Sequence, residues 1–163
     1  MFPRVLLAAS LLAAPAQADR PYVGVFLGSW HAGTDDLNGV NPGLTYGRRW
    51  AAARPGMEWH MEGGVFLNSY EEVSPILLGG LSARVADLPG GSLRIGVSAG
   101  TAYYQDLSDD LRDTYGIPAI GPFIPLVAAT AAYRTERVEW RLTALPSGGD
   151  VDAVVNLSLA VPF

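Results

Sequence analysis

The last thirteen residues, Val151–Phe163, constrain the fold of this chain more than any other segment. Every second residue from the end is apolar: Phe163, Val161, Leu159, Leu157, Val155, Ala153 and Val151. The residues between them are smaller or more polar: Pro162, Ala160, Ser158, Asn156, Val154 and Asp152. A period of two indicates a β-strand, and an apolar face with a terminal aromatic residue is typical of the closing strand of an outer-membrane β-barrel. The alternative is a soluble edge strand, but such an apolar edge would promote aggregation.

The N-terminal segment predicts export across a membrane. It carries one early positive charge at Arg4, an apolar stretch over Val5–Ala14, and then Ala16-Gln17-Ala18. This is the layout of a secretory signal peptide with a small-x-small cleavage site. The apolar stretch is too short for a membrane anchor, which needs about 20 residues. We therefore expect residues 1–18 to be removed and residues 19–163 to form the barrel domain.

The composition favours membrane strands over membrane helices. Hydrophobic residues make up 49% of the chain and the mean hydropathy is +0.19, yet the most apolar stretch, residues 117–133, contains three prolines and a glycine. A membrane chain without spanning helices can only form a closed barrel. The net charge of −5 argues against a nucleic-acid partner. The absence of cysteine rules out disulfides and thiolate chemistry.

Turn signals divide the chain into eight strand-length segments, which predict an all-β fold, an eight-stranded antiparallel transmembrane β-barrel. The segments are Tyr22–His31, Asn41–Trp50, Met57–Leu67, Val73–Val85, Ser92–Tyr104, Ile117–Tyr133, Val138–Leu145 and Val151–Phe163. With both ends in the periplasm, the acidic segment Gln105–Gly116 becomes an external loop, expected to be solvated. We expect a monomer in a Gram-negative outer membrane, inserted by the barrel-assembly machinery through its last strand.

The predicted inward faces differ between the two ends of the barrel. Charged residues gather near the periplasmic end, where they should pair and form a plug: Glu58, His60, Glu62, Arg84, Arg94, Glu139 and Arg141. Nearer the external end the inward residues are apolar or small: Gly64, Phe66, Ile76, Leu78, Gly80, Gly96, Gly100 and Ala102. Small residues leave space in a barrel. The lumen then holds either a hollow for a hydrocarbon chain or closely packed side chains without a ligand.

The two histidines differ in their surroundings. His60 lies in Glu58-x-His60-x-Glu62 on one strand face, a pattern that favours a salt-linked plug over a metal site because a third ligating element is lacking. His31 ends the first segment at the external rim, where Asn68 and Ser69 also end the third. A histidine and a serine at one rim are the minimum for acyl transfer: a proton acceptor and a hydroxyl.

Several local sequences resemble the PagP-type lipid A palmitoyltransferases. Ser29-Trp30-His31 followed by Asn41-Pro42-Gly43-Leu44 resembles the family's first hairpin. Asn68-Ser69, then Ser74-Pro75-Ile76 and Gly79-Gly80, resembles its second external loop and the next strand. Ile117-Pro118 with Pro125-Leu126, and Thr143-Ala144-Leu145-Pro146, resemble its proline-interrupted sixth and seventh strands.

The resemblance implies an outer-membrane enzyme that moves a palmitoyl chain from a phospholipid to lipid A without a metal or cofactor. Its essential His, Asp and Ser match His31, Asn68 and Ser69, and its acyl-length glycine matches Gly80. Phe66, Ile76, Leu78, Gly96 and Gly100 would line the acyl site. Prolines that break strand pairing admit lipid from the side; Pro125 and Pro146 match one such pair, and Pro42 half of another.

Two departures leave other functions open. The family's amphipathic helix before the first strand is reduced to Asp19, Arg20 and Pro21. Asn68 replaces an Asp, and Asn cannot stabilise a charged histidine; the analogous change in serine proteases costs about 10⁴-fold. Either Asn68 suffices, or a nearby acid substitutes (Asp35, Asp36, Glu71 or Glu72), or the protein is a non-catalytic barrel that stiffens the membrane or binds surface partners. A lipid A deacylase that uses the same His and Ser is the remaining alternative.

Overall fold

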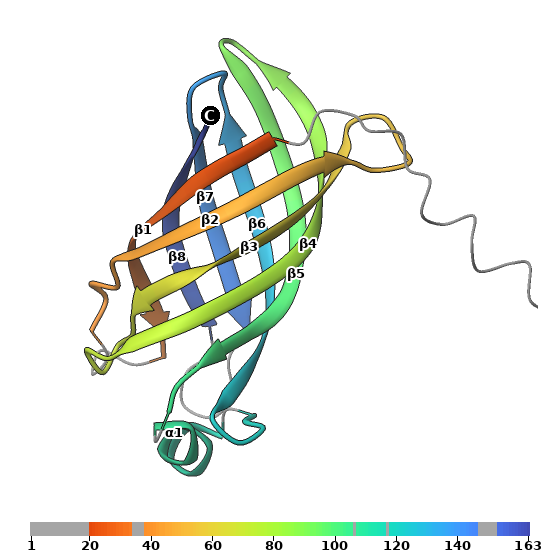
Figure 1. The fold of residues 1–163 in the computed structure, drawn as a ribbon. Coiled ribbons are helices and arrows are strands. Elements are labelled where there is room, and N and C mark those ends of the chain that lie inside the picture. Colours follow the sequence, from red (N-terminus) through yellow and green to blue (C-terminus); the bar gives the residue numbers. More distant parts are fainter. Residues whose placement is uncertain (1–19, 34–37, 106, 117, 147–152) are drawn as a thin grey trace, which may run out of the picture.

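The chain forms a closed barrel of eight antiparallel strands in sequence order, with β1 pairing β8 to close it (Figure 1). This computed structural model describes residues 20–33, 38–105, 107–116, 118–146 and 153–163. The strands are β1 (Arg20–Ala32), β2 (Gly43–Ala51), β3 (Met57–Leu67), β4 (Val73–Leu88), β5 (Gly91–Tyr103), β6 (Phe123–Arg134), β7 (Glu139–Pro146) and β8 (Ala153–Pro162).

The outer wall of the barrel is apolar, as the alternation predicted. The outward positions expose Leu44, Tyr46, Trp59, Met61, Val65, Leu77, Ile95, Val97, Val127, Trp140, Leu142, Leu157 and Val161. A soluble protein rarely exposes so large a contiguous apolar surface. A barrel with such a wall spans a bilayer, because closure pairs the backbone groups that lipid cannot satisfy. The predicted eight-stranded antiparallel transmembrane β-barrel is therefore confirmed.

Most predicted strands match the observed ones to within a few residues, but β6 begins later than expected. The segment Ile117–Tyr133 was expected to be one strand, whereas β6 starts at Phe123. Gly121 has a φ of 57°, and Ile120 and Phe123 form an isolated bridge across it. A tight turn thus occupies the start of the apolar stretch. Ile117 lies outside the described residues, as do residues 151 and 152 of the predicted last strand.

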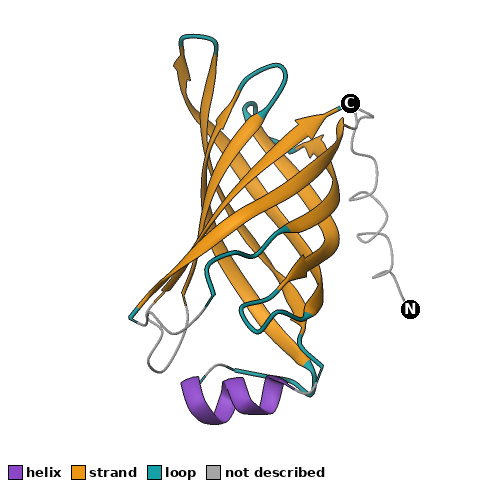
Figure 2. Ribbon diagram, turned by 90° about the vertical axis from the view of Figure 1, so that its left-hand side faces the viewer, coloured by secondary structure: helices purple, strands orange, loops and turns teal. Residues whose placement is uncertain are grey.

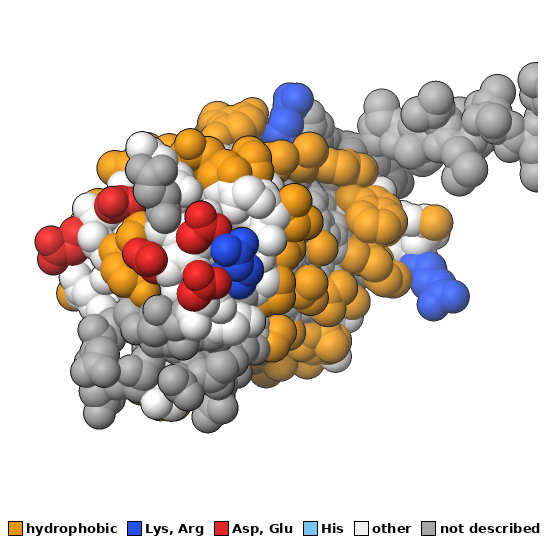
Figure 3. Space-filling view, turned by 90° about the horizontal axis from the view of Figure 1, so that it is seen from below, with side chains coloured by type: hydrophobic (Ala, Val, Ile, Leu, Met, Phe, Trp, Pro, Cys, Tyr) orange, Lys and Arg blue, Asp and Glu red, His pale blue; other side chains and the backbone are white. Residues whose placement is uncertain are grey.

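The third external segment, expected to be a solvated loop, keeps its acidic side chains exposed but is helical. Most of this segment forms helix α1 (Leu107–Tyr115), which lies at the external end of the barrel (Figure 2). Its acidic Asp109 and Asp110 stand in the first turn, where the helix dipole favours negative charge. Gly116, with a φ of 63°, ends the helix. Leu111 is buried and forms part of the lumen wall, while the acidic side chains remain exposed (Figure 3).

The predicted signal peptide, residues 1–18, lies outside the described residues. In the part of the chain that the structure describes, no helix is long and apolar enough to cross a membrane.

A closed barrel predicts a heat-modifiable electrophoretic mobility. Unboiled protein should stay compact in dodecyl sulfate and migrate differently from boiled protein, because all strands must separate before the barrel opens. The protein should also float with outer membranes on a density gradient. Identical mobility before and after boiling, or recovery in the soluble periplasmic fraction, would contradict the fold.

Candidate functional site

A network of ion pairs fills the lumen near the periplasmic end. Glu139 pairs with Arg49 at 2.7 Å, with Arg141 at 2.7 Å, and with Arg134. Arg141 also pairs with Glu62 at 2.7 Å. Glu58 accepts from Arg134 at 2.6 Å and lies 3.2 Å from Arg94. We call these seven residues the plug: Glu58, Glu62, Glu139, Arg49, Arg94, Arg134 and Arg141.

Tyr22 and Thr45 complete the hydrogen bonding of the plug. The Tyr22 hydroxyl donates to Glu62 at 2.6 Å, and the Thr45 hydroxyl donates to its other oxygen at 2.6 Å. The guanidinium of Arg49 lies 3.9 Å from the centre of the Tyr22 ring. Every buried side-chain nitrogen and oxygen among the described residues has a hydrogen-bond partner. The plug therefore meets the condition under which buried charges are tolerated.

Arg84 lies on the predicted inward face of β4, opposite Arg94 in the register, but its predicted place in the plug is wrong. Its side chain is half exposed and pairs with Asp87. A β-bulge interrupts the β4–β5 register between Arg84 and Ala86, in the part of this hairpin that rises beyond the rest of the barrel (Figure 1). The bulge follows Arg84 and leaves its face unchanged. Arg84 stays outside the plug because it stands where this hairpin begins to extend beyond its neighbours, within reach of Asp87. Arg84 consequently contributes no charge to the plug.

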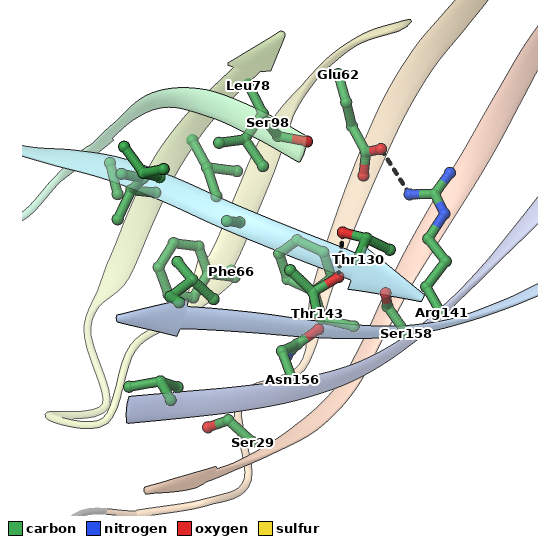
Figure 4. Close-up of a pocket in the computed structure, with 18 of the residues that line it drawn as sticks. Ser29, Glu62, Phe66, Leu78, Ser98, Thr130, Arg141, Thr143, Asn156 and Ser158 are labelled. Atoms are coloured by element: carbon green, nitrogen blue, oxygen red, sulfur yellow. Dashed lines mark hydrogen bonds and ion pairs between the residues drawn. The ribbon is translucent and has the colours of Figure 1, made fainter. Parts of the chain in front are cut away.

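Above the plug lies a cavity of about 520 Å³, a volume typical of small-molecule sites. Its wall includes six of the residues expected to bind the acyl chain: Phe66, Ile76, Leu78, Gly96, Pro125 and Pro146. Figure 4 shows Phe66 and Leu78 on one side, with Thr130, Thr143, Asn156 and Ser158 on the other. The lumen therefore contains a cavity above its polar floor, as the hollow predicted from the small inward residues requires.

Gly80 and Gly100, also expected on the cavity wall, instead allow close packing. A Cβ atom at Gly80 would lie 2.2 Å from the Val97 carbonyl oxygen, and one at Gly100 would lie 1.9 Å from that of Leu77. Register places Gly80 between His60 on β3 and Ser98 on β5. Because Gly80 lacks a side chain, the His60 ring passes over it and its Nε2 atom meets the Ser98 hydroxyl at 2.9 Å.

The cavity reaches the outer wall between β6 and β7. These strands pair only from Ala129 with Ala144 down to Arg134 with Glu139, although β6 continues to Phe123. The outward residues Pro125 and Val127 line the cavity together with inward ones. Proline has no amide hydrogen with which to continue a ladder. Among the described residues, the wall is therefore unpaired beside this part of β6, and we call this place the β6–β7 gap.

At the external rim, a β-bulge turns His31 into the lumen. The β1–β8 register shifts between Phe26 and Gly28, so that Leu27 is an extra residue. Tyr22 and Gly24 face inward before the bulge. After it the inward positions are odd-numbered instead of even-numbered, because a one-residue shift moves side chains to the opposite face of the strand. His31 is accordingly buried, while the neighbouring Trp30 is 64% exposed on the outer wall.

His31 and Ser69 meet at the mouth of the cavity. The His31 Nε2 atom lies 3.1 Å from the Ser69 hydroxyl oxygen, and both residues line the cavity. Hydrogen-bonded histidine and serine can transfer a proton and hold an ester or a hydroxyl. The structure therefore brings together two of the three residues proposed from the sequence to carry the chemistry.

Asn68, the third residue, holds the β3–β4 loop. It is fully buried. Its side-chain oxygen accepts from the backbone N–H groups of Tyr70 at 2.9 Å and Glu72 at 3.0 Å, and its amide nitrogen donates to Ser74 at 3.1 Å. Among the described residues, no carboxylate forms a hydrogen bond with His31. Asp35 and Asp36, two of the acids that could substitute, lie outside the described residues.

In the described part of the chain, no group of three or more His, Cys, Asp or Glu side chains is arranged to hold a metal ion. His60 points toward Ser98 and not toward a cluster of ligands.

Sequence reasoning missed three members of the polar floor: Tyr22, Arg49 and Arg134. Tyr22 and Arg49 each stand an even number of residues from other inward positions of their strands. This period of two could have identified them from the sequence. Arg134 follows the predicted segment Ile117–Tyr133 and so falls outside the predicted strands. Its side chain nevertheless reaches Glu58, 76 positions away in sequence, a contact that only barrel closure reveals.

Comparisons with known proteins identify the fold. No family model and no curated protein matches the sequence. A de novo designed transmembrane β-barrel is similar over 90% of this chain and 98% of its own length, with a TM-score of 0.54 and 17% identity. The outer membrane protein Ail of Yersinia pestis is similar over 90% of this chain and all of its own, with a TM-score of 0.46 and 11% identity.

The plug predicts a strong effect of neutralising its central carboxylate. Glu139→Gln should lower the free energy of unfolding by about 3 kcal/mol, because three buried guanidinium groups lose a shared negative charge. The exposed Asp113→Asn in α1, which also loses an ion pair, should change it by less than about 0.5 kcal/mol. Urea unfolding of the barrel in phospholipid vesicles measures both. Equal stability of the two variants would contradict the plug.

Proposed function

We propose that this protein is an outer-membrane acyltransferase that moves a fatty acyl chain from a phospholipid to lipid A in the outer leaflet. The observation that carries the proposal is the His31–Ser69 contact at the mouth of an apolar cavity. The floor of that cavity is the charged plug, and its side opens at the β6–β7 gap. A phospholipid acyl chain that enters the gap fills the cavity with its ester near the rim.

The chemistry follows from the positions of the two polar groups. His31 accepts the proton of the lipid A hydroxyl as the hydroxyl oxygen forms a bond with the ester carbonyl carbon. The bond from this carbon to the glycerol oxygen then breaks, and the proton passes to that oxygen, which leaves as lysophospholipid. Ser69 donates a hydrogen bond to the ester oxygen. General acid–base catalysis by a positioned histidine contributes about 10²–10⁴-fold to such a reaction.

Asn68 acts in this proposal through the loop and not through the histidine. Its hydrogen bonds to Tyr70, Glu72 and Ser74 fix the chain on both sides of Ser69. The serine is thereby held where it meets His31. Asn68 is a positioning residue, and the proton transfer depends on His31.

A non-catalytic barrel that stiffens the membrane or binds surface partners is the second candidate. The observation that favours it is the absence, among the described residues, of a carboxylate bonded to His31. A barrel of this kind would use the apolar wall and the exposed acidic helix α1 without modifying lipid. A deacylase would use the same His31 and Ser69, with water in place of the lipid A hydroxyl.

Mass spectrometry of lipid A separates the three functions. Expression in a Gram-negative host that lacks such an activity should increase the mass of lipid A by one fatty acyl group. Loss of an acyl group would indicate the deacylase instead. Unchanged lipid A, with both the natural protein and an Asn68→Asp variant in the membrane, would favour the non-catalytic barrel.

Removal of either polar group at the rim should abolish the reaction. His31→Ala and Ser69→Ala should each eliminate lipid A acylation while lowering the free energy of unfolding by only about 1 kcal/mol. Ser92→Ala makes the same chemical change at the start of β5, at the opposite end of the barrel, and should leave acylation unchanged. Wild-type acylation by both rim variants would show that the assignment is wrong.

Asn68→Asp should be tolerated and should raise activity. An aspartate oxygen keeps both backbone N–H donors, and the Ser74 hydroxyl can rotate to donate to the other oxygen. A negative charge near His31 would stabilise its protonated form. The rate of acyl transfer should increase severalfold, measured with phospholipid vesicles and lipid A. A folded Asn68→Asp barrel with unchanged or lower activity would exclude this electrostatic effect.

A further inference from the structure

The plug carries more positive than negative charge. It contains four arginines, at positions 49, 94, 134 and 141, but three glutamates, at positions 58, 62 and 139. With His60 neutral, the cluster has one unbalanced positive charge. Arg49, Arg94, Glu62 and Glu139 are each about 5% exposed, so water screens this charge poorly. An unbalanced buried charge is costly and favours an anion beside it.

Arg94 is the arginine with the weakest charge compensation. Its carboxylate partner, Glu58, is 3.2 Å away and lies closer, at 2.6 Å, to Arg134. The other hydrogen bonds of Arg94 are to neutral acceptors: the Ser82 hydroxyl at 3.2 Å, the Ser82 carbonyl at 3.4 Å and the Gly56 carbonyl at 3.1 Å. These bonds use its Nε and Nη2 atoms, and its charge is only partly neutralised.

The cavity extends down to the wall at Arg94, because Arg94, Gly96 and Ser98 all line it. Gly96 follows on the same inward face of β5, lines the cavity and has no side chain. Ser98 comes next on that face. Residues two apart in a strand are separated by about 6.7 Å. The contact of Arg94 with Ser82, the register partner of Gly96, brings its guanidinium to the level of that glycine.

Ser98 can supply a second hydrogen bond from above. When the His60 Nε2 atom carries the proton, it donates to the Ser98 oxygen across 2.9 Å. The Ser98 hydroxyl hydrogen is then available for an acceptor over Gly96. The walls beyond this point, at Leu78 and Ile76, are apolar. A polar pocket with one excess positive charge thus lies beneath an apolar chamber.

We propose that this pocket binds the carboxylate of a long-chain fatty acid. The carboxylate lies over Gly96, between Arg94 and Ser98. The hydrocarbon tail extends upward past Leu78 and Ile76 toward the β6–β7 gap. A carboxylate carries one negative charge and balances the plug, whereas a doubly charged phosphate monoester would overcompensate it. This orientation is opposite to that of the acyl chain in the proposed transfer reaction, and it requires neither His31 nor Ser69.

The test is native mass spectrometry of the full barrel released from detergent micelles, with equal concentrations of palmitate and hexadecanol. The wild type should bind one palmitate, with at least a tenfold preference over the alcohol. Arg94→Gln, which makes the plug neutral, should lose that preference. Arg112→Gln removes an exposed arginine of α1, at the opposite end of the barrel, and should retain it. Equal binding of acid and alcohol by the wild type, or an unchanged preference in Arg94→Gln, would overturn the proposal.

Glu58→Gln keeps the test decisive if Arg94→Gln fails to fold. It raises the excess to two positive charges and should increase the preference for palmitate at least threefold; an unchanged preference would contradict the charge argument. Dodecyl phosphate that displaces palmitate from the wild type would overturn the choice of a carboxylate. The binding experiment does not measure lipid A acylation, so a negative result would not contradict the acyltransferase proposal. In the same way, unchanged lipid A would not contradict the proposed binding of a fatty acid.

Discussion

The ion-pair network at Glu139 and Arg141 determines how the rest of the lumen is used. An eight-stranded barrel is narrow enough for side chains to fill it. Here the filling is concentrated at the periplasmic end, where arginines from β2, β5, β6 and β7 meet glutamates from β3 and β7. These long side chains connect opposite walls and seal the floor. The upper lumen can then remain hollow, because the plug alone closes the periplasmic end of the barrel.

The cavity above this floor faces the membrane at the β6–β7 gap in its side wall. The unpaired part of β6 and the end of β7 leave the β6–β7 gap in an otherwise hydrogen-bonded wall. Both histidines hydrogen-bond a serine on the cavity wall, His31 at the mouth and His60 near the floor. The hollow thus has polar groups at each end and apolar walls between them, an arrangement complementary to a lipid chain with a polar end.

Much of this architecture could be predicted from the sequence, because alternation along a strand directly records the two faces of a barrel. The apolar outer wall and the charged floor followed from it, while turn signals gave the strand count and the strand ends placed His31 and Ser69 at one rim. The bulge at Leu27 could not be predicted, since an extra residue changes the parity of side chains without a clear local signal. Arg84 keeps its predicted face, but alternation does not record how far the β4–β5 hairpin extends beyond the other strands, so its place outside the plug was not predicted.

The remaining differences have other physical causes. Helix α1 forms because Leu107 and Leu111 are four residues apart and Leu111 can bury itself at the barrel mouth, a tertiary effect that the acidic composition concealed. Gly80 appeared to offer space for a ligand. In the folded barrel that space belongs to the His60 ring, because register places His60 and Ser98 on either side of it. Asn68 appeared to be a partner for His31, yet its buried amide is committed to its own loop.

The central claim of this account is that a membrane lipid chain enters the barrel from the side and occupies its cavity. Photocrosslinking measures this directly, with the barrel in vesicles of a phospholipid that carries a photoreactive group at the end of one acyl chain. Mapping the crosslinked residues by mass spectrometry should identify lumen positions such as Leu78 and Ala128. Crosslinks confined to outward positions such as Val97 and Leu142 would show that lipid chains remain outside and would contradict the claim.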